Sequence, residues 1–595
     1  MTLKKTFFHI LFVLLFPINI FSQDTFNSKI NFDFEALDDH IPKGWDNFGN
    51  DGYKLGIDSS VVWSGNNSAF IEFEKGKTGF HAWSFSIPAN YIGKKIRLTG
   101  HIKTENITEG FAGLWMRIDP KVAFYNMRDR GITGTTEWQK YEIELKYDPS
   151  RAERILVGGL LGGNGKMWMD NLEVTIDGKK LEDSEKLGLT AEVKQSLQKQ
   201  LKKNKKDLNL TSEELLDRSL QSLIESIGDK KIVAIGEDTH GTSEYYQLRE
   251  AITKKLIINK GFNMVILENP YDDIELMVER FKSESLDTLM KKHLFSIYQT
   301  KEMLSFLEWY KMVGTKKNVE LKGSDDSYWV IPNLIEEQLI TFEDKKLKVL
   351  INNLKDAANL SVVQYNQKYL KSDRKAANEN QLGVYTYEAA LALEEYLVSH
   401  ELLNKKMEEY LFNIKSTYIN YLHLAHKKPI QSRDEMMAKR IAYFAKDPDS
   451  KIVVWAHNAH ISNITVMNGE IGLMGCNLKR ELGDDYHSIG MSSLKGNYSY
   501  IDSRLINNDH YFDDKLREEQ LIYQPKKSWE KIFNEISNAF YFETIKFARI
   551  KDITNLKLVG YGKERLTDYY SLTPLKMFDT IFFINITSAT KPLFD

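Results

Sequence analysis

The feature that most restricts the fold is a pair of apolar runs separated by a helical stretch. The runs are KIVAIGE (231–237) and FNMVILE (262–268), and the stretch between them covers 243–259. A strand, a helix and a strand in this order predict a βαβ unit, whose two strands are parallel. We therefore predict an α/β domain with a mainly parallel sheet over 213–595.

The same region supplies further strands and a long helical segment. The chain from 332 to 444 is charged and has few helix breakers, which predicts a helical insertion over 330–445, large enough to cap one sheet edge. The further predicted strands are VELKGSD (319–325), KIVVWAH (451–457), YHSIGMS (486–492), KLVGYG (557–562) and FDTIFFIN (578–585).

The first part of the chain has a different pattern. Short alternating runs, such as 68–74 and 138–147, are separated by Gly, Asn and Asp, which predicts an antiparallel, jelly-roll-like β-sandwich over 24–180. Its tryptophans either stack on sugar rings from exposed positions or fill the space between the sheets. They are six of the ten in the chain: Trp45, Trp63, Trp83, Trp115, Trp138 and Trp168.

Two segments are expected to lie outside these domains. Residues 1–22 carry Lys4 and Lys5 near their start, followed by an apolar stretch and then by polar residues. This order is typical of a signal peptide, and less typical of a membrane anchor. A secreted or periplasmic protein follows from this interpretation. Residues 181–212 are lysine-rich and helical, and we interpret them as a solvated helical linker in preference to an anionic-surface patch.

Charge and cysteine content exclude several classes of function. Lys and Arg number 80 against 83 Asp and Glu, for a net charge of −3, so the basic field of a nucleic-acid-binding protein is absent. Cys476 is the only cysteine, which excludes an intrachain disulfide and any multi-thiolate metal site.

Acidic and imidazole side chains follow four of the predicted strands. In open α/β sheets the ligand crevice lies beyond the carboxyl ends of the parallel strands. We therefore expect these side chains to meet in one site, although each lies far from the others in the sequence. They are Glu237, Asp238 and His240 after the first run, Glu268 after the second, Asp325 and Asp326 after the third, and His457 and His460 after the fourth.

Histidine and glutamate together suit general acid–base chemistry. An imidazole takes a proton from water, and a carboxylate fixes its tautomer and stabilises the imidazolium. Glu237 and His240 share one loop and form the natural pair. Arg249, on the following helix, either stabilises an oxyanion or binds an anionic substrate group, or forms a surface ion pair with Glu244.

Missing motifs remove competing chemistries. The chain has no G-x-S-x-G, H-E-x-x-H, P-loop or G-x-G-x-x-G, which argues against a serine hydrolase, zincin, NTPase or dinucleotide enzyme. A metal stays open, since His240, His457, His460 and Glu268 are competent ligands. We favour a water-activating dyad without metal or cofactor.

The segments 236–270 (GEDTHGTSEYYQLREAITKKLIINKGFNMVILENP) and 453–462 (VVWAHNAHIS) resemble the erythromycin esterase family. Weaker matches are GSDD (323–326), SRDEMMAKRI (432–441) and FDTIFFINITSATKPL (578–593). The sandwich resembles the carbohydrate-binding-like modules of secreted bacterial enzymes, above all in its closing strand, WMDNLEV.

The esterase resemblance implies an α/β enzyme that cleaves a macrolactone or related ester with histidine-activated water, without a serine nucleophile or required metal. Carried over by motif, His240 is the favoured general base. The second histidine motif leaves His457 and His460 as alternatives, and Asp238 departs from the family by adding a carboxylate that would raise a neighbouring histidine's pKa if it faced inward. The other implied site residues are Glu237, Glu268 and Arg249, with Asp325 and Arg433 binding substrate. The alternative for Arg433 is that it only ties the helical insertion to the core.

Three hypotheses follow. The first is an exported hydrolase of a small-molecule ester or lactone, with macrolides, other lactones and acylated polysaccharides all open as substrates. The second is a glycan-binding sandwich fused to a catalytically silent body. The third is a metal-dependent hydrolase on the same scaffold.

Overall fold

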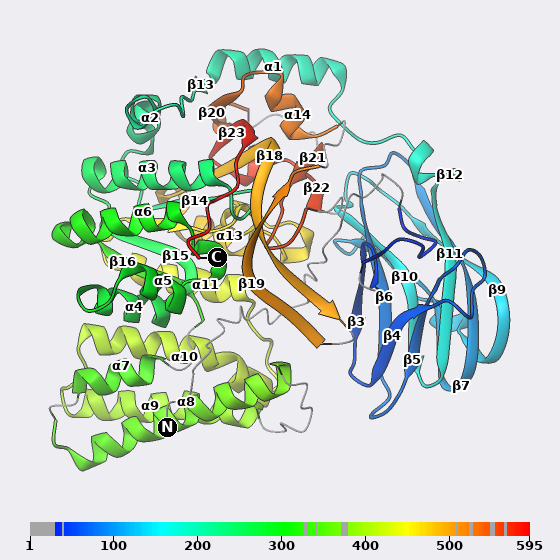
Figure 1. Cartoon of the computed structure of the whole chain (residues 1–595), viewed down its shortest axis with the longest axis horizontal. Coiled ribbons are helices and arrows are strands. Elements are labelled where there is room, and N and C mark those ends of the chain that lie inside the picture. Colours follow the sequence, from blue (N-terminus) through cyan, green and yellow to red (C-terminus); the bar gives the residue numbers. More distant parts are fainter. Residues whose placement is uncertain are drawn as a thin grey trace.

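The computed structural model describes residues 30–38, 41–326, 330–339, 342–370, 379–506, 509–522, 527–547, 554–564 and 568–594. A β-sandwich and a larger α/β body lie side by side in it (Figure 1). The predicted signal peptide, 1–22, lies outside the described residues.

The amino-terminal domain is one antiparallel sheet that curls about the long strand β7 (Lys95–Asp119) into two facing halves. The first half of β7 pairs with β9 and β11, and its second half pairs with β8 and β10. This arrangement confirms the predicted sandwich. The remaining strands are β3 (Trp45–Gly49), β4 (Tyr53–Asp58), β5 (Ser68–Phe73), β6 (Phe80–Pro88), β8 (Ala123–Tyr125), β9 (Ile132–Lys146), β10 (Arg154–Gly163), β11 (Lys166–Ile176) and β12 (Lys179–Lys180), beside a small hairpin of β1 (Leu37–Asp38) and β2 (Ile41–Pro42).

Most sandwich tryptophans are buried. Trp45, Trp83, Trp115 and Trp168 are at most 3% exposed, whereas Trp63 is 47% exposed. Large rings contribute the most apolar area to a thin core. The space-filling interpretation therefore holds for Trp45 and Trp83, which belong to the core between the two halves, whereas Trp115 packs with Ala82 and Leu160 in a separate small cluster. Tryptophan count alone does not indicate a sugar-binding surface.

The α/β body is built on a second, mainly parallel sheet, as predicted. Its strands follow the order β13-β20-β23-β18-β14-β17-β15-β16. Strand β20 is antiparallel to both of its neighbours, β13 and β23, and all other neighbouring pairs in this order are parallel. Strand β19 extends β18 as an antiparallel arm. The bounds are β13 (Lys206–Asp207), β14 (Ile232–Ile235), β15 (Met264–Pro270), β16 (Glu320–Asp325), β17 (Ile452–Trp455), β18 (Tyr486–Ile506), β19 (Asp509–Gln520), β20 (Ala539–Glu543) and β23 (Thr580–Thr587).

The central strands are apolar along their whole length because helices cover both faces. In β14, Val233 and Ile235 pack on one helical layer, and Ile232 and Ala234 pack on the other. Among the described residues, no helix is both long and apolar enough to cross a membrane. The first layer contains α2 (Glu213–Ile227), α3 (Ser243–Lys260), α5 (Leu286–His293) and α6 (Lys301–Trp309); the second contains α1 (Ala191–Asn204), α11 (Arg433–Ala445), α13 (Leu473–Leu482) and α14 (Trp529–Asn534).

The helix within the predicted linker packs onto the body. Leu197 and Leu201 of α1 are buried in the second core, and Lys194 Nζ lies 2.7 Å from Glu535 Oε1. The charged face remains exposed, so α1 is an amphipathic helix docked on the α/β body and is not fully solvated.

The described residues of the predicted helical insertion, 330–445, form five helices. A buried ion pair attaches it to the sheet edge, because Lys322 Nζ on β16 lies 2.6 Å from Glu409 Oε1 on α10 and 2.8 Å from Glu275 Oε1. The neighbouring helix α4 (Tyr271–Glu279) carries Glu275. The insertion comprises α7 (Val330–Leu339), α8 (Lys345–Leu370), α9 (Glu379–Ser399), α10 (Lys405–Ala425) and α11.

One strand prediction is wrong. The segment 557–562 does not join the main sheet: β21 (Thr554–Lys557) ends at its first residue and pairs with β22 (Tyr569–Leu572) in a separate antiparallel sheet. After β21 the chain crosses to the end of β14, where Val559 N donates a 2.7 Å hydrogen bond to Asp238 O. In this segment Val559 makes only an isolated parallel bridge, to Thr239, so its pairing with the end of β14 does not extend into a strand.

Candidate active site

The strand ends meet at one edge of the sheet. Strands β14, β17, β15 and β16 are consecutive neighbours, and each is parallel to the next, so their carboxyl ends converge. The short helix α12 (Asn458–Ile461) and helices α3 and α11 add side chains to the same place. The structure brings together the eight residues to which a role was assigned: Glu237, His240, Arg249, Glu268, Asp325, Arg433, His457 and His460. Asp326, which was also expected here, instead pairs with Arg440, whose Nη2 lies 2.6 Å from its Oδ1.

The first cluster joins a histidine, a carboxylate and a buried guanidinium. His240 Nδ1 lies 2.8 Å from Glu237 Oε1, and Arg249 Nη1 lies 3.1 Å from the same oxygen. Arg249 is fully buried, and its Nη2 donates to the carbonyls of Ala456 at 2.7 Å and Ile235 at 3.3 Å. The alternative of a surface ion pair for Arg249 is therefore wrong.

The ring of His240 is held between two other rings. Its centroid lies 4.8 Å from that of His457 and 4.5 Å from that of Tyr561. Nδ1 is used by Glu237, and Nε2 has no hydrogen-bond partner among the described residues. An imidazole oriented in this way presents the lone pair of Nε2 to a substrate or a water molecule.

His457 has both ring nitrogens in use. Nδ1 accepts a 3.2 Å hydrogen bond from Ala459 N at the start of α12, and Nε2 donates to Val559 O at 3.1 Å. Burial lowers the pKa of His457 well below its ordinary value, and the neighbouring His240 and His460 lower it further. His457 is therefore a neutral ring in a fixed orientation, and it packs against the ring of His240.

His460 is held in the charged form. Its Nδ1 lies 2.7 Å from Asp434 Oδ1 and its Nε2 lies 3.3 Å from Glu268 Oε1. Burial opposes the charge, but these two carboxylates outweigh it and raise the pKa of His460 to about 10. At neutral pH this imidazole is a cation and does not accept a proton.

Glu268 and Arg433 join the two sides of the site. Glu268 Oε2 accepts a 2.9 Å hydrogen bond from His457 N, and Oε1 lies 3.0 Å from Arg433 Nη2. Burial raises the pKa of Glu268, but His460 and Arg433 outweigh burial and hold it well below its ordinary value. Arg433 also binds Asp325 as a fork, with Nε and Nη2 lying 2.6 and 2.7 Å from its two oxygens.

Asp238 faces away from His240. Its Oδ1 accepts a 2.6 Å hydrogen bond from Tyr245 Oη, and its Oδ2 lies 3.3 Å from the buried Lys557 Nζ. Oδ2 also accepts a 3.0 Å hydrogen bond from Ser493 N. Asp238 is therefore part of a separate buried network, and the inward orientation that would raise a histidine's pKa does not occur.

Three contributors to the site were not predicted. Asp434 follows Arg433 directly in the SRDEMMAKRI segment, so the helical position next to a predicted site residue was an available signal. Tyr561 and Val559 lie in the segment that was wrongly predicted as a sheet strand, and they reach the histidines only because the folded chain crosses to the end of β14.

Within the described part of the chain, no group of three or more His, Cys, Asp or Glu side chains is arranged to hold a metal ion.

A parallel sheet with an acid–base cluster at its carboxyl edge is the arrangement of an α/β enzyme. The erythromycin esterase family matches residues 257–587, more than half of the chain. The chain belongs to that family, and the resemblance expected from the two motifs is confirmed.

Individual relatives extend the match. Erythromycin esterase type II of Escherichia coli is 22% identical over 403 residues, covering 62% of this chain and 92% of that protein. The uncharacterized HTH-type transcriptional regulator YbfP of Bacillus subtilis (strain 168) is 35% identical over 128 residues, which cover 20% of this chain and only 42% of that protein. The crystal structure of a succinoglycan biosynthesis protein has a TM-score of 0.53 at 19% identity, over 68% of this chain and all of that one, which shows the shared fold.

Proposed function

We propose that the protein hydrolyses an ester or lactone with a water molecule activated by His240. The observation that carries the proposal is the unequal state of the three clustered histidines. His460 is protonated and His457 uses both nitrogens, whereas His240 has one nitrogen fixed by Glu237 and the other without a partner among the described residues. His240 is thus the histidine suited to act as a general base.

The proposed reaction begins with proton transfer to His240 Nε2. The oxygen of the water forms a bond to the carbonyl carbon of the ester while His240 takes the water proton. Glu237 stabilises the resulting imidazolium across the 2.8 Å contact with Nδ1. The ion pair with Arg249 fixes the Glu237 carboxylate in its orientation toward His240.

The developing oxyanion needs positively charged donors. Arg433 Nη1 lies 3.3 Å from His460 Nε2, and both side chains are partly exposed, at 16% and 17%. The rest of the guanidinium is used by Asp325 and Glu268, so Nη1 is the part available to a substrate oxygen. When the tetrahedral intermediate collapses, the bond to the leaving oxygen breaks and His240 returns the proton to it.

The substitution His240→Gln tests the role of His240. We expect it to lower ester turnover by roughly a thousandfold, because the base is removed. The test uses a panel of macrolides, other lactones, acylated polysaccharides and small esters with mass detection, and an unchanged unfolding transition serves as the control. Retention of full turnover on any ester would contradict the proposal.

Two further properties belong to this proposal. Residues 1–22 act as an export signal, so a culture expressing the full chain releases a protein that lacks them, as terminal mass analysis would show.

The reaction runs without metal, so turnover persists after chelation and dialysis. Loss of turnover on chelation, with recovery on addition of a divalent metal, would favour the metal-dependent alternative.

A further inference from the structure

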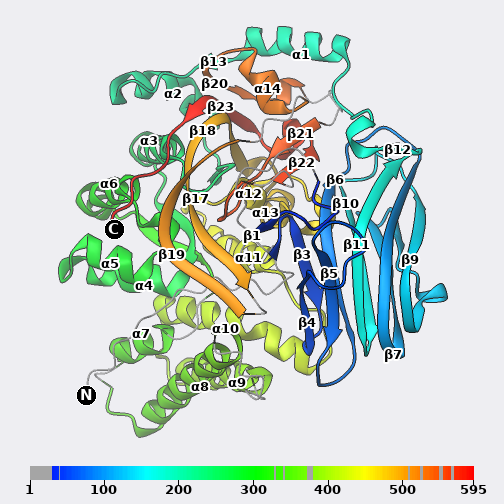
Figure 2. The ribbon, with the colours of Figure 1, turned by 45° about the vertical axis from the view of Figure 1, so that its right-hand side comes forward.

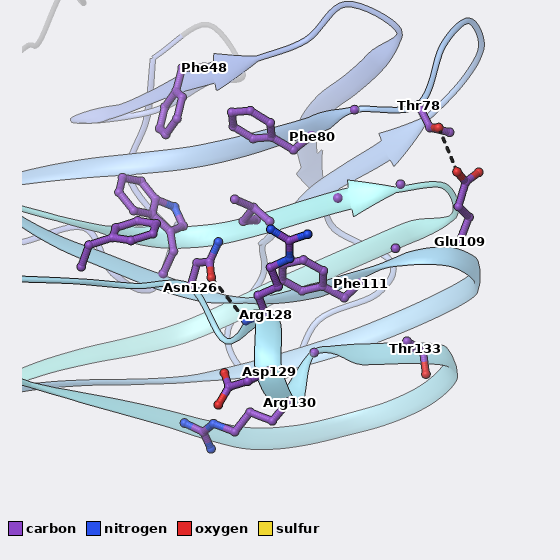
Figure 3. A pocket seen from close by; sticks show the side chains of 18 of the residues that line it. Phe48, Thr78, Phe80, Glu109, Phe111, Asn126, Arg128, Asp129, Arg130 and Thr133 are labelled. Atoms are coloured by element: carbon purple, nitrogen blue, oxygen red, sulfur yellow. Dashed lines mark hydrogen bonds between the residues drawn. The ribbon is translucent and has the colours of Figure 1, made fainter.

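The sandwich carries an open groove on the outer face of the half formed by β3, β6, β8, β10 and the second half of β7 (Figure 3). Its volume is about 960 Å³. In Figure 3, Phe48 and Phe80 lie at the top of the view, with Phe111 and Arg128 below them. The groove belongs entirely to the sandwich and contains none of the predicted active-site residues.

Aromatic rings line this groove at different depths. Trp115 lies at its floor, 2% exposed, with its Nε1 bonded to Trp83 O at 2.9 Å. Phe48 packs edge-on against Trp115, with ring centroids 5.3 Å apart. Phe80 and Phe124 remain 39% and 59% exposed. Burying such rings is favourable once a ligand with an apolar face covers them.

The polar side chains of the groove differ in what they already bind. Arg117 Nε lies 2.8 Å from Asp119 Oδ1, and Arg130 Nε donates to Tyr125 Oη at 3.1 Å. The guanidinium of Arg128 also lines the groove, and it makes no hydrogen bond or ion pair with any residue that the structure describes. Arg128 therefore offers five N–H donors to a ligand.

This mixture of groups fits a sugar chain better than a lipid or an apolar peptide. A sugar ring has an apolar carbon–hydrogen face and a rim of hydroxyl groups, which match exposed aromatic faces surrounded by hydrogen-bonding groups. A wholly apolar ligand would remove Arg128, Asp129 and Glu109 from water without replacing their hydrogen bonds, at a cost in free energy.

The groove lies on the face of the sandwich that meets the α/β body. Alternate residues of a strand share a face, so Arg154 and Leu160 of β10 point the same way. Leu160 lines the groove, while Arg154 Nη2 lies 2.7 Å from Glu470 Oε1 of the body. In Figures 1 and 2, β6 and β10 are nearer the body than β9, so a chain in the groove along β10 points toward the body.

We propose that this groove is a saccharide-binding site, in which Phe80 and Phe124 stack on sugar rings and Arg128 binds a hydroxyl or carboxylate group of the chain. Binding here keeps the enzyme body close to a polysaccharide. The inference stands apart from the proposed ester hydrolysis, because it concerns a different domain and a different set of contacts.

Affinity electrophoresis of the full chain in gels containing soluble polysaccharide tests the proposal. The probes are two neutral polymers, xylan and galactan, and one acidic polymer, polygalacturonate, with the His240→Gln protein used so that no ester is consumed. We expect retardation by at least one polymer and a loss of affinity of about tenfold or more in the double variant Phe80→Ala/Phe124→Ala. Arg128→Ala weakens retardation on polygalacturonate alone if the contact is a carboxylate, and on a neutral polymer as well if it is a hydroxyl.

Trp63→Ala is the matched control. Trp63 is an exposed sandwich aromatic, stacked on His101 at 4.2 Å, that lies outside the groove lining. This variant should bind as the parent does. Retardation by none of the three polymers, or retardation lost in Trp63→Ala and kept in the Phe80/Phe124 variant, would overturn the site. Ester turnover is measured separately, so its absence bears only on the proposed hydrolysis.

Discussion

The carbonyl oxygen of Val559 accepts a hydrogen bond from His457 Nε2 at 3.1 Å. The amide of the same valine donates to Asp238 O at 2.7 Å, so the segment after β21 is fixed to the loops after both β14 and β17. This arrangement gives His457 a fixed tautomer and leaves it no nitrogen for catalysis. We assign it a positioning role, in which its ring packs against His240.

Glutamine substitutions at the two histidines should therefore differ. In His457→Gln the side-chain amide can replace the Nε2 donor to Val559, so we expect kcat to fall by about tenfold or less. In His240→Gln the base is lost and kcat falls by roughly 10²–10⁴. Initial rates of ester hydrolysis measure both. Equal losses in the two variants would place His457 in the chemistry.

Removal of Arg249 should destabilise the fold more than removal of an exposed arginine. Arg249→Met leaves Glu237 buried without its cation and frees the carbonyls of Ile235 and Ala456, for an expected loss of roughly 3–5 kcal/mol in the free energy of unfolding.

The control for this prediction is Arg280→Met. Arg280 pairs with Glu337 at 3.0 Å, but both side chains are at least 40% exposed, so we expect a loss below about 1 kcal/mol. Urea unfolding followed by fluorescence compares the two variants with the parent. Similar midpoints for both variants would show that the buried pair is not a major stabilising contact.

The convergence of the site was predictable from local sequence. The runs before Glu237, Glu268 and His457 are continuous and apolar because both faces of a parallel strand are covered, and parallel strands bring their ends to one edge. The sandwich was likewise predictable, because alternation of apolar and polar residues along a segment indicates a strand with one buried face.

The orientation of side chains within the site was not predictable. Asp238 and Glu237 are adjacent in sequence, yet Asp238 binds Lys557 and Glu237 binds His240. Neighbouring side chains of an extended backbone point to opposite sides, but the identity of the partner of Asp238 depends on Lys557, which lies far along the chain. The contact between Tyr561 and His240 also joins residues that lie far apart in the sequence, so no local sequence pattern indicates it.

Stability should fall at alkaline pH because of His460. Its pKa is raised from 6.5 to about 10 in the folded protein, so its contribution is complete below about pH 6.5 and is lost as the pH rises through 10. The expected loss is of the order of a few kcal/mol. Unfolding midpoints of the parent and His460→Gln between pH 6 and 10 should converge toward the alkaline end. A constant difference between them would contradict the assigned charge.

Arg433→Lys should impair turnover more than substrate binding. A lysine cannot hold both oxygens of Asp325 while contacting Glu268, because the planar fork is replaced by a single ammonium group. The donor proposed for the oxyanion is then misplaced, and we expect kcat to fall by about 10²-fold with a smaller change in KM. Asp325→Asn should act through the same contact, so the double variant should lose less than the product of the two single effects. Steady-state kinetics of the three variants measures this coupling, and independent, multiplicative losses would show that Asp325 does not act through Arg433.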